Sequence, residues 1–121
     1  MSPRILVIED QEDNRRILRD LLTSAGYEVI EAVTGEEGGA MAETHRPDLI
    51  LMDIQLPDLD GYEATRRIKA NPALRHIPLI AVTSYALSGD DVKALEAGCD
   101  GYVAKPFSPR ALLAKIREYL P

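Results

Sequence analysis

ILVIED at residues 5–10 and LILMD at residues 49–53 decide the fold of this 121-residue chain. Each is a continuous apolar run that ends in acidic residues. Continuous apolar runs are typical of parallel strands that are buried on both faces of a sheet. If these two strands are neighbours, Glu9, Asp10 and Asp53 meet at one edge of the sheet.

A lysine follows a third short apolar run, GYVA at residues 101–104, and precedes a proline. Lys105 therefore reaches the same edge if that run is also a parallel strand. Each pair of like charges ~4 Å apart costs about 1 kcal/mol in water and about 4 kcal/mol at an effective dielectric near 20. The acidic residues consequently need a cation, and the candidates are a divalent metal ion and Lys105.

The rest of the chain predicts strands that alternate with helices. Apolar residues at helical spacing indicate the helices, and glycine or proline marks where several of them end. We expect strands over residues 5–8, 28–32, 49–52, 77–82 and 101–104. We expect helices between residue 10 and Gly26, over 34–45, 61–70 and 86–97, and from Ser108 to the end.

Such βαβ units have right-handed crossovers, which produce a parallel sheet covered by helices on both faces. The sequence therefore predicts a doubly wound α/β fold, with residues 1–121 forming one domain. In open sheets of this class, ligands bind beyond the carboxyl ends of the strands, where the strand order reverses. The acidic edge would occupy such a position if the strand order reverses between the first and third strands.

Two adjacent glycines, Gly38 and Gly39, conflict with the second helix. Each costs roughly 0.5 to 1 kcal/mol relative to alanine in a helix interior. We therefore predict that this helix frays locally.

Composition excludes several classes of partner. Fourteen basic and 20 acidic residues give a net charge of -6, which argues against nucleic acid or an anionic membrane as the direct partner. The single cysteine, Cys99, rules out an internal disulfide framework and suits a reducing compartment. The N-terminus resembles neither a signal peptide nor a membrane span, so we expect a soluble cytoplasmic protein.

Four stretches in order, ILVIED, PDLILMDIQLPDLDG, IPLIAVTS and GYVAKPFS, resemble the receiver domain of two-component response regulators over nearly the whole chain. The amino-acid sequence of these stretches is most similar to DivK-type single-domain receivers and to receivers of hybrid histidine kinases. The resemblance implies a flavodoxin-like (CheY-like) three-layer (βα)5 fold whose five-stranded parallel sheet has the order 2-1-3-4-5.

The resemblance also implies a role for each residue of the site. Asp53 would accept a phosphoryl group from a phosphohistidine on a sensor histidine kinase or histidine phosphotransferase. Lys105 and Thr83 would each bond a phosphoryl oxygen. Mg²⁺, or Mn²⁺ in its place, would be held by Glu9, Asp10, Asp53 and the backbone carbonyl of Gln55.

Further expectations concern the response to phosphorylation. Thr83 would move toward the phosphoryl group, and Tyr102 would turn inward. This would change the face formed by the fourth helix, fifth strand and fifth helix. A downstream protein would bind at this face, or a second copy would bind there to form a weak phosphorylation-linked dimer. Pro57 and Gly61 match the family's loop after the acceptor, where glycine permits an unusual backbone shape, and Lys105–Pro106 matches its cis peptide bond.

Other interpretations compete with this one. A flavin-binding protein of the same fold class needs a phosphate loop rich in glycine and hydroxyl groups after the first strand, but DQEDN at residues 10–14 is acidic. A metal-dependent phosphatase with an aspartyl nucleophile has closer chemistry, although such enzymes usually need a larger chain. The chain could also be a receiver module excised from a hybrid kinase or a transcription factor. We expect a phosphoacceptor that catalyses only its own phosphorylation and dephosphorylation, without further enzymatic activity.

Overall fold

The computed structural model describes residues 2–54, 56, 58, 61–83, 96–105 and 107–120, and for Thr83 it describes the backbone. The elements in order are β1 (Arg4–Ile8), α1 (Glu12–Ser24), β2 (Glu28–Ala32), α2 (Gly35–His45), β3 (Leu49–Asp53), α3 (Gly61–Ala70), β4 (Leu79–Thr83), β5 (Gly101–Ala104) and α5 (Pro109–Arg117). The helix expected over residues 86–97 lies outside the described residues, except that Glu96 and Ala97 are helical.

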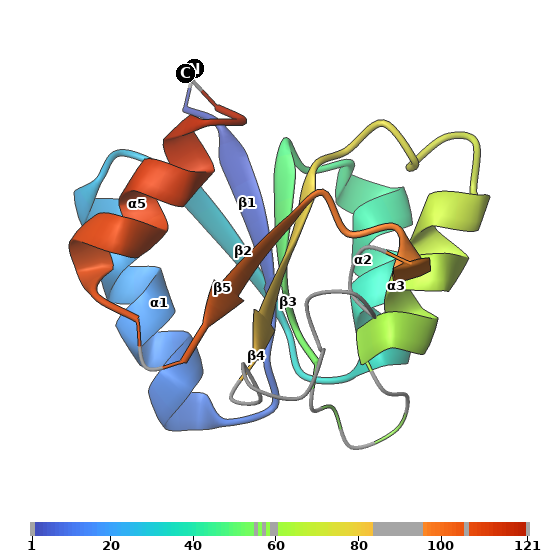
Figure 1. The fold of residues 1–121 in the computed structure, drawn as a ribbon, viewed down its shortest axis with the longest axis horizontal. Coiled ribbons are helices and arrows are strands. Elements are labelled where there is room, and N and C mark those ends of the chain that lie inside the picture. Colours follow the sequence, from blue (N-terminus) through green and yellow to red (C-terminus); the bar gives the residue numbers. More distant parts are fainter. Residues whose placement is uncertain are drawn as a thin grey trace.

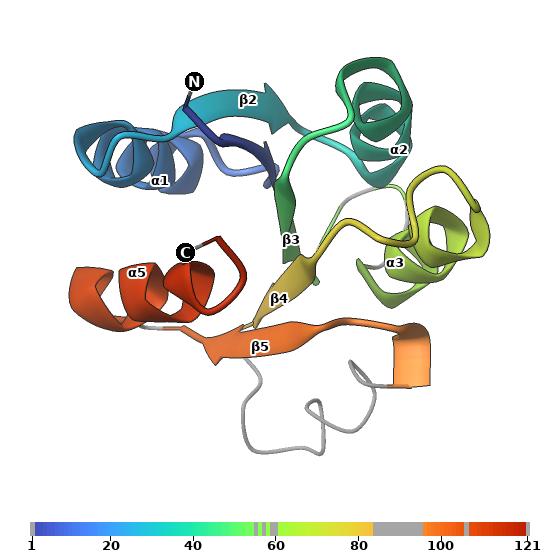
Figure 2. The same cartoon turned by 90° about the horizontal axis from the view of Figure 1, so that it is seen from above.

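The five strands form one parallel sheet in the order β2-β1-β3-β4-β5, which confirms the expected order. The helices α1 and α5 cover one face, and α2 and α3 cover the other, so the molecule has three layers (Figures 1 and 2). All five residues of β3 are buried, whereas the edge strand β2 is buried only at Ala32. Burial on both faces explains why the central strands have continuous apolar sequences.

Two apolar cores lie between these layers. One contains Leu6, Ile8 and Met52 and packs toward α2 and α3, and the other contains Val7, Leu51 and Ile80 and packs toward α1 and α5. Successive residues of a strand point to opposite faces, so each central strand contributes to both cores. Among the described helices, none has the length and apolarity needed to cross a membrane.

Local signals set the ends of the helices as the sequence indicated. The hydroxyl of Thr34 accepts a hydrogen bond from the backbone N–H of Glu37, and Ser108 caps α5 in the same way before a proline. Gly26 follows α1 with a φ of 94°, a conformation that glycine adopts without strain.

Polar contacts join the starts of β4 and β5, at the end of the sheet opposite the acidic residues. The ammonium of Lys69 donates to the backbone carbonyl of Ile77 and to Asp100, both at 2.7 Å. The same carboxylate oxygen of Asp100 accepts from the backbone N–H of Leu79 at 2.8 Å. This network fixes the start of β4, which begins two residues later than the predicted position of 77.

Candidate phosphoryl acceptor site

The register of the sheet brings two acidic residues side by side. Ile8 of β1 pairs with Met52 of β3, so the residues that follow them, Glu9 and Asp53, stand at the same level of neighbouring strands. Neighbouring strands are about 4.8 Å apart, a distance that carboxylate side chains span easily. The predicted convergence of strand ends is therefore a direct consequence of the register.

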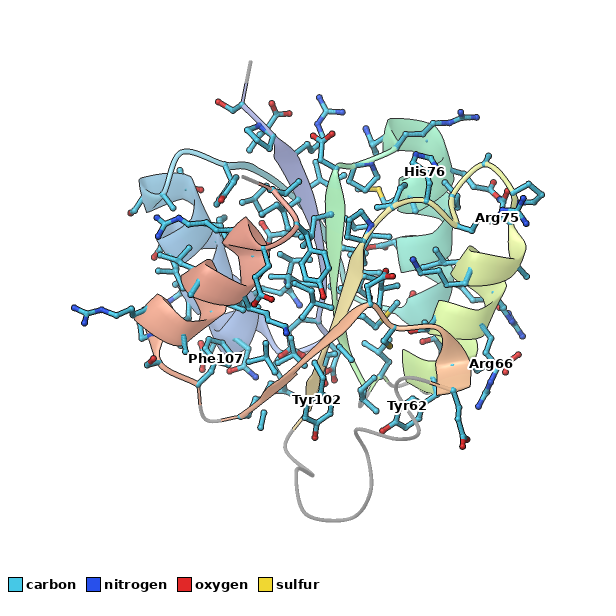
Figure 3. All side chains as sticks on the ribbon, turned by 45° about the horizontal axis from the view of Figure 1, so that its top comes forward. Tyr62, Arg66, Arg75, His76, Tyr102 and Phe107 are labelled. Atoms are coloured by element: carbon cyan, nitrogen blue, oxygen red, sulfur yellow. The ribbon has the colours of Figure 1, made fainter. Side chains whose placement is uncertain are left out.

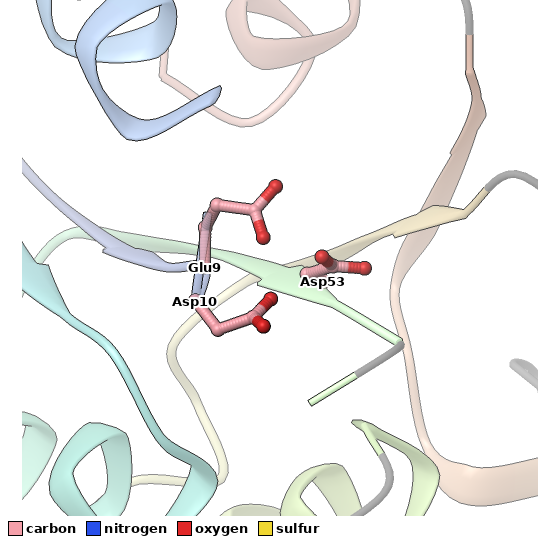
Figure 4. A group of neighbouring side chains, drawn as sticks. All are labelled: Glu9, Asp10 and Asp53. Atoms are coloured by element: carbon pink, nitrogen blue, oxygen red, sulfur yellow. The ribbon is translucent and has the colours of Figure 1, made fainter. Parts of the chain in front are cut away.

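Three carboxylates meet at this edge. Glu9, Asp10 and Asp53 each offer an oxygen, and these oxygens lie within 4.8 Å of one another. Figure 4 shows the three side chains extending from the ends of the two strands into a shared space. Glu9 and Asp53 are only 2% and 6% exposed, whereas Asp10 is half-buried. Two of the three negative charges are thus largely removed from water.

Lys105 reaches the cluster from the end of β5. Its ammonium lies 3.2 Å from a carboxylate oxygen of Glu9 and 3.5 Å from one of Asp53. One positive charge against three negative charges leaves this group with a negative balance. Because charge–charge interactions are strong in a partly buried site, a further cation is favoured there.

Burial raises the pKa of Glu9 above its ordinary value, and the hydrogen bond and negative charge of Asp53 raise it further. The charge and hydrogen bond of Lys105 act in the opposite direction and are weaker. Apolar side chains of Val7, Leu18 and Leu51 line the small space next to Glu9 and Asp53, which explains the loss of hydration. Glu9 therefore carries its negative charge at a cost in the folded protein.

The donor set matches a hard divalent cation. Carboxylate oxygens are the ligands that Mg²⁺ prefers, usually one or two of them together with retained waters and a substrate phosphate. The cluster supplies three carboxylates, and its half-buried member Asp10 leaves it open to solvent and to a phosphate. Gln55, whose backbone carbonyl was predicted to complete the ligand set, lies outside the described residues.

Gly61 contributes to the site through close packing. A Cβ atom at this position would lie 2.5 Å from the Cα of Ile54 and 2.6 Å from the backbone oxygen of Asp53. Glycine is thus required because α3 begins in direct contact with the end of β3. Pro57, predicted to act with it, lies outside the described residues.

The two residues predicted to act as a switch lie on β4 and β5, which follow β3 in the order of the sheet. Thr83 ends β4 and pairs with Ala104, the residue before Lys105. Tyr102 of β5 is half-buried and packs against the core on the α2–α3 side together with Tyr62 (Figure 3). Their movement on phosphorylation stays a prediction. Pro106, and with it the predicted cis bond, lies outside the described residues.

Arg15 is a residue that the sequence interpretation missed. From the first turn of α1, its guanidinium donates to the backbone oxygens of both Glu9 and Asp10, each at 3.0 Å. An arginine five residues after the last acid of the strand, at the start of the next helix, was the available signal. This signal is weak, because an arginine in a helix is usually exposed to solvent.

A doubly wound parallel sheet with a buried acidic cluster and a lysine at its carboxyl edge defines a class of phosphate- and metal-binding signalling domains. The sequence profile of the response regulator receiver domain matches residues 5–117. The chain belongs to this family, and it is a receiver domain of two-component signal transduction. The comparisons do not favour the phosphatase interpretation.

Relatives of similar length support this assignment. The polar-differentiation response regulator DivK of Brucella anthropi is 44% identical over 120 residues, which cover 99% of this chain and 98% of that protein. DivK of Brucella ovis is 43% identical over the same share. The predicted similarity to DivK-type receivers is therefore confirmed.

Solved structures show the same fold. The receiver domain of the sensor histidine kinase PA1611 from Pseudomonas aeruginosa has a TM-score of 0.93 and 40% identity, covering 99% of this chain and 98% of that one. A magnesium ion is coordinated in the active site cleft of that protein. A receiver domain protein from Methanospirillum hungatei has a TM-score of 0.91 and 38% identity, covering 99% and 94% of the two chains.

Proposed function

We propose that residues 1–121 act as one receiver domain that accepts a phosphoryl group on Asp53 from a phosphohistidine. A sensor histidine kinase or a histidine phosphotransferase would be the donor. The observation that carries this proposal is the position of Asp53, which is 6% exposed, shares its site with two other carboxylates, and lies 3.5 Å from the ammonium of Lys105.

The transfer is a substitution at phosphorus. A carboxylate oxygen of Asp53 forms the new P–O bond while the P–N bond to the donor imidazole breaks, and the imidazole keeps the electron pair and takes up a proton. Such a transfer needs alignment and charge stabilisation more than covalent help. The ammonium of Lys105 would bond a phosphoryl oxygen, and the hydroxyl of Thr83 would bond another.

Glu9, Asp10, Asp53 and the backbone carbonyl of Gln55 would hold Mg²⁺, with Glu9 acting through a water molecule. The bound metal would supply positive charge to the phosphoryl oxygens. Mn²⁺ would substitute because it accepts the same oxygen ligands. Since these groups belong to the receiver itself, the chain would also catalyse its own phosphorylation from small phosphodonors and its own dephosphorylation.

The phosphorylated chain would signal through the surface around Tyr102 of β5 and helix α5. Drawing Thr83 toward the phosphoryl group would let the Tyr102 ring turn inward. The downstream protein, or a second copy in a weak dimer, must then bind the phosphorylated form more tightly, because equal affinity shifts no population. We place this exchange in the cytoplasm, where kinases obtain ATP, without direct contact to nucleic acid or membrane.

Incubation with acetyl phosphate and Mg²⁺ tests the proposal. Intact mass and peptide mapping should show one phosphoryl group on Asp53, and chelation of Mg²⁺ should prevent it. Asp53→Asn should abolish labelling, whereas Asp20→Asn, which alters an exposed aspartate of α1, should not. Labelling that persists in Asp53→Asn at the wild-type rate would contradict the assignment of the acceptor.

A further inference from the structure

We propose that Arg15 is a positioning residue that fixes the backbone carrying Glu9 and Asp10 and thereby preorganises the acidic cluster for Mg²⁺. This inference rests on the proposed function, because it assigns a task to a residue outside the ligand set. It gives helix α1 a direct role in the site at the end of β1.

The contacts of Arg15 are made to main chain. Its Nη1 donates to the carbonyl oxygens of Glu9 and Asp10, both at 3.0 Å and both in part-buried positions. Hydrogen bonds from a charged donor are roughly twice as strong as those between neutral groups. Their partners here carry two of the three carboxylates that form the cluster.

The two carbonyls belong to the successive peptide planes on either side of the Asp10 Cα atom. With both planes held by one nitrogen, the backbone dihedrals of Asp10 are fixed, and the direction of its Cα–Cβ bond is fixed with them. Glu9 is also held on its other side, because its N–H donates to the carbonyl of Ala32 at 3.0 Å. The two acids therefore have little freedom to turn away from Asp53.

Arg15 is itself held in place by β2. Its Nε lies 3.5 Å from a carboxylate oxygen of Glu31, whose other oxygen lies 3.0 Å from Nη1 of Arg19. The side chain of Arg15 is 17% exposed, compared with 46% for Arg19 and 58% for Arg16. Arg15 is therefore the arginine of this helix that is built into the interior rather than solvated.

Charge and positioning make opposite predictions for metal affinity. If Arg15 mattered only as a nearby positive charge, its removal would strengthen Mg²⁺ binding, because like charges repel. If it holds the ligands in place, its removal weakens Mg²⁺ binding, because groups that orient metal ligands contribute to affinity. If Arg15 contributed only to folding stability, its removal would leave the Mg²⁺ affinity of the folded protein unchanged.

The test compares the Mg²⁺ dissociation constants of Arg15→Met, Arg15→Lys and Arg16→Met, measured by isothermal titration with MgCl₂ on folded protein. Arg15→Met should bind Mg²⁺ about tenfold more weakly than wild type. Arg15→Lys keeps the charge but loses the planar guanidinium that bridges two carbonyls and Glu31. Its affinity for Mg²⁺ should therefore lie between those of wild type and Arg15→Met. Arg16→Met, which changes a residue paired with Glu12, should match wild type.

Amide hydrogen exchange without metal gives a second measurement. Asp10 and Gln11 should exchange faster in Arg15→Met than in Arg16→Met. Unchanged or tighter Mg²⁺ binding in Arg15→Met would overturn the inference. If that variant does not fold, the same comparison for Arg15→Lys decides. A wild-type chain that neither binds Mg²⁺ nor is labelled at Asp53 would instead refute the proposed function, so the two failures are distinguishable.

Discussion

Glu9 is the residue at which the competing electrostatic effects of the site are clearest. It is 2% exposed, it lies in a cluster with Asp10 and Asp53, and its nearest cation is Lys105 at 3.2 Å. Burial and Asp53 raise its pKa, so ionised Glu9 is less stable in the folded protein than in water. In the proposed function, Glu9 helps to hold Mg²⁺ through a water molecule, and this task requires the deprotonated carboxylate despite the cost.

A pH dependence of stability follows for the metal-free protein. Because the folded pKa of Glu9 lies above its ordinary value of 4.5, the unfolded chain releases this proton first. The contribution of protonated Glu9 to the free energy of unfolding is therefore fully present below about pH 4.5. It is lost as the pH rises through the pKa that Glu9 has in the folded protein. Glu9→Gln in EDTA should therefore be more stable than wild type at neutral pH, with the difference vanishing in acid.

Urea unfolding of both proteins across this pH range measures the effect. Asp20→Asn provides a matched control, because Asp20 is exposed on α1 and its substitution should produce no such trend. A Glu9→Gln protein less stable than wild type at neutral pH without metal would show that Lys105 outweighs burial.

The sequence was sufficient to predict which site residues come together when their position depends only on where a strand ends. Glu9, Asp53 and Lys105 were predicted to converge because parallel strands end at one edge, and the structure brings them together. Arg15 could not be found in this way. Its contacts depend on the rotation of α1 about its own axis, which brings a charged side chain against backbone carbonyls, and the apolar pattern of the helix does not encode such contacts.

Among the elements, boundaries were predicted best where the chain carries its own stop signals. The strand over residues 28–32, the helix over 61–70 and the strand over 101–104 have the predicted bounds. The fourth strand does not, because Ile77 is buried in a turn in which its N–H bonds the carbonyl of Leu74. An apolar side chain indicates burial but not backbone conformation, and the hydrogen bond from Lys69 to the carbonyl of Ile77 joins two different elements of the fold.

The adjacent glycines of α2 differ in their surroundings. A Cβ on Gly38 would contact the Cδ1 atom of Ile8 and lie 2.8 Å from its Cγ1 atom, and Ile8 is fully buried. A Cβ on Gly39 would meet nothing within 4 Å. Gly38 thus allows α2 to approach β1 closely, whereas Gly39 has no such packing reason. The helix is continuous over Gly35–His45, and its predicted fraying stays a prediction.

These surroundings predict opposite effects for a matched pair of substitutions. Gly39→Ala should raise the free energy of unfolding by about 0.5 to 1 kcal/mol, because it reduces the entropy of the unfolded chain. Gly38→Ala should lower it by about 1 to 3 kcal/mol, because the core around Ile8 becomes overpacked. Urea unfolding measures both, and two stabilised variants would contradict the close packing. Amide exchange in α2 should also slow in Gly39→Ala if the wild-type helix frays.

At the scale of the whole molecule, the topology turns separate strand ends into one site. The order β2-β1-β3-β4-β5 makes β1 and β3 neighbours and reverses between them, which is where ligands bind in open sheets of this class. The same arrangement concentrates negative charge in a chain whose net charge is already -6. The folded state therefore carries a local repulsion that the unfolded chain does not have.

A bound cation should relieve that repulsion and stabilise the entire fold. A ligand that binds only the folded state at 100 times its dissociation constant adds about 2.7 kcal/mol. For a domain of this size, that gain should raise the midpoint of thermal unfolding by on the order of 10 °C. The measurement is thermal unfolding followed by circular dichroism, in MgCl₂ and in NaCl at equal ionic strength.

NaCl separates site binding from general screening of the net charge, because screening depends on ionic strength and not on a coordination site. Asp10→Asn removes one carboxylate of the cluster while leaving the apolar layers unchanged, so its midpoint should respond equally to the two salts. If wild type also responded equally to both, the acidic cluster would be a screened surface feature rather than a binding site. A larger shift in MgCl₂ for wild type alone would tie the stability of the sheet to the three carboxylates at its edge.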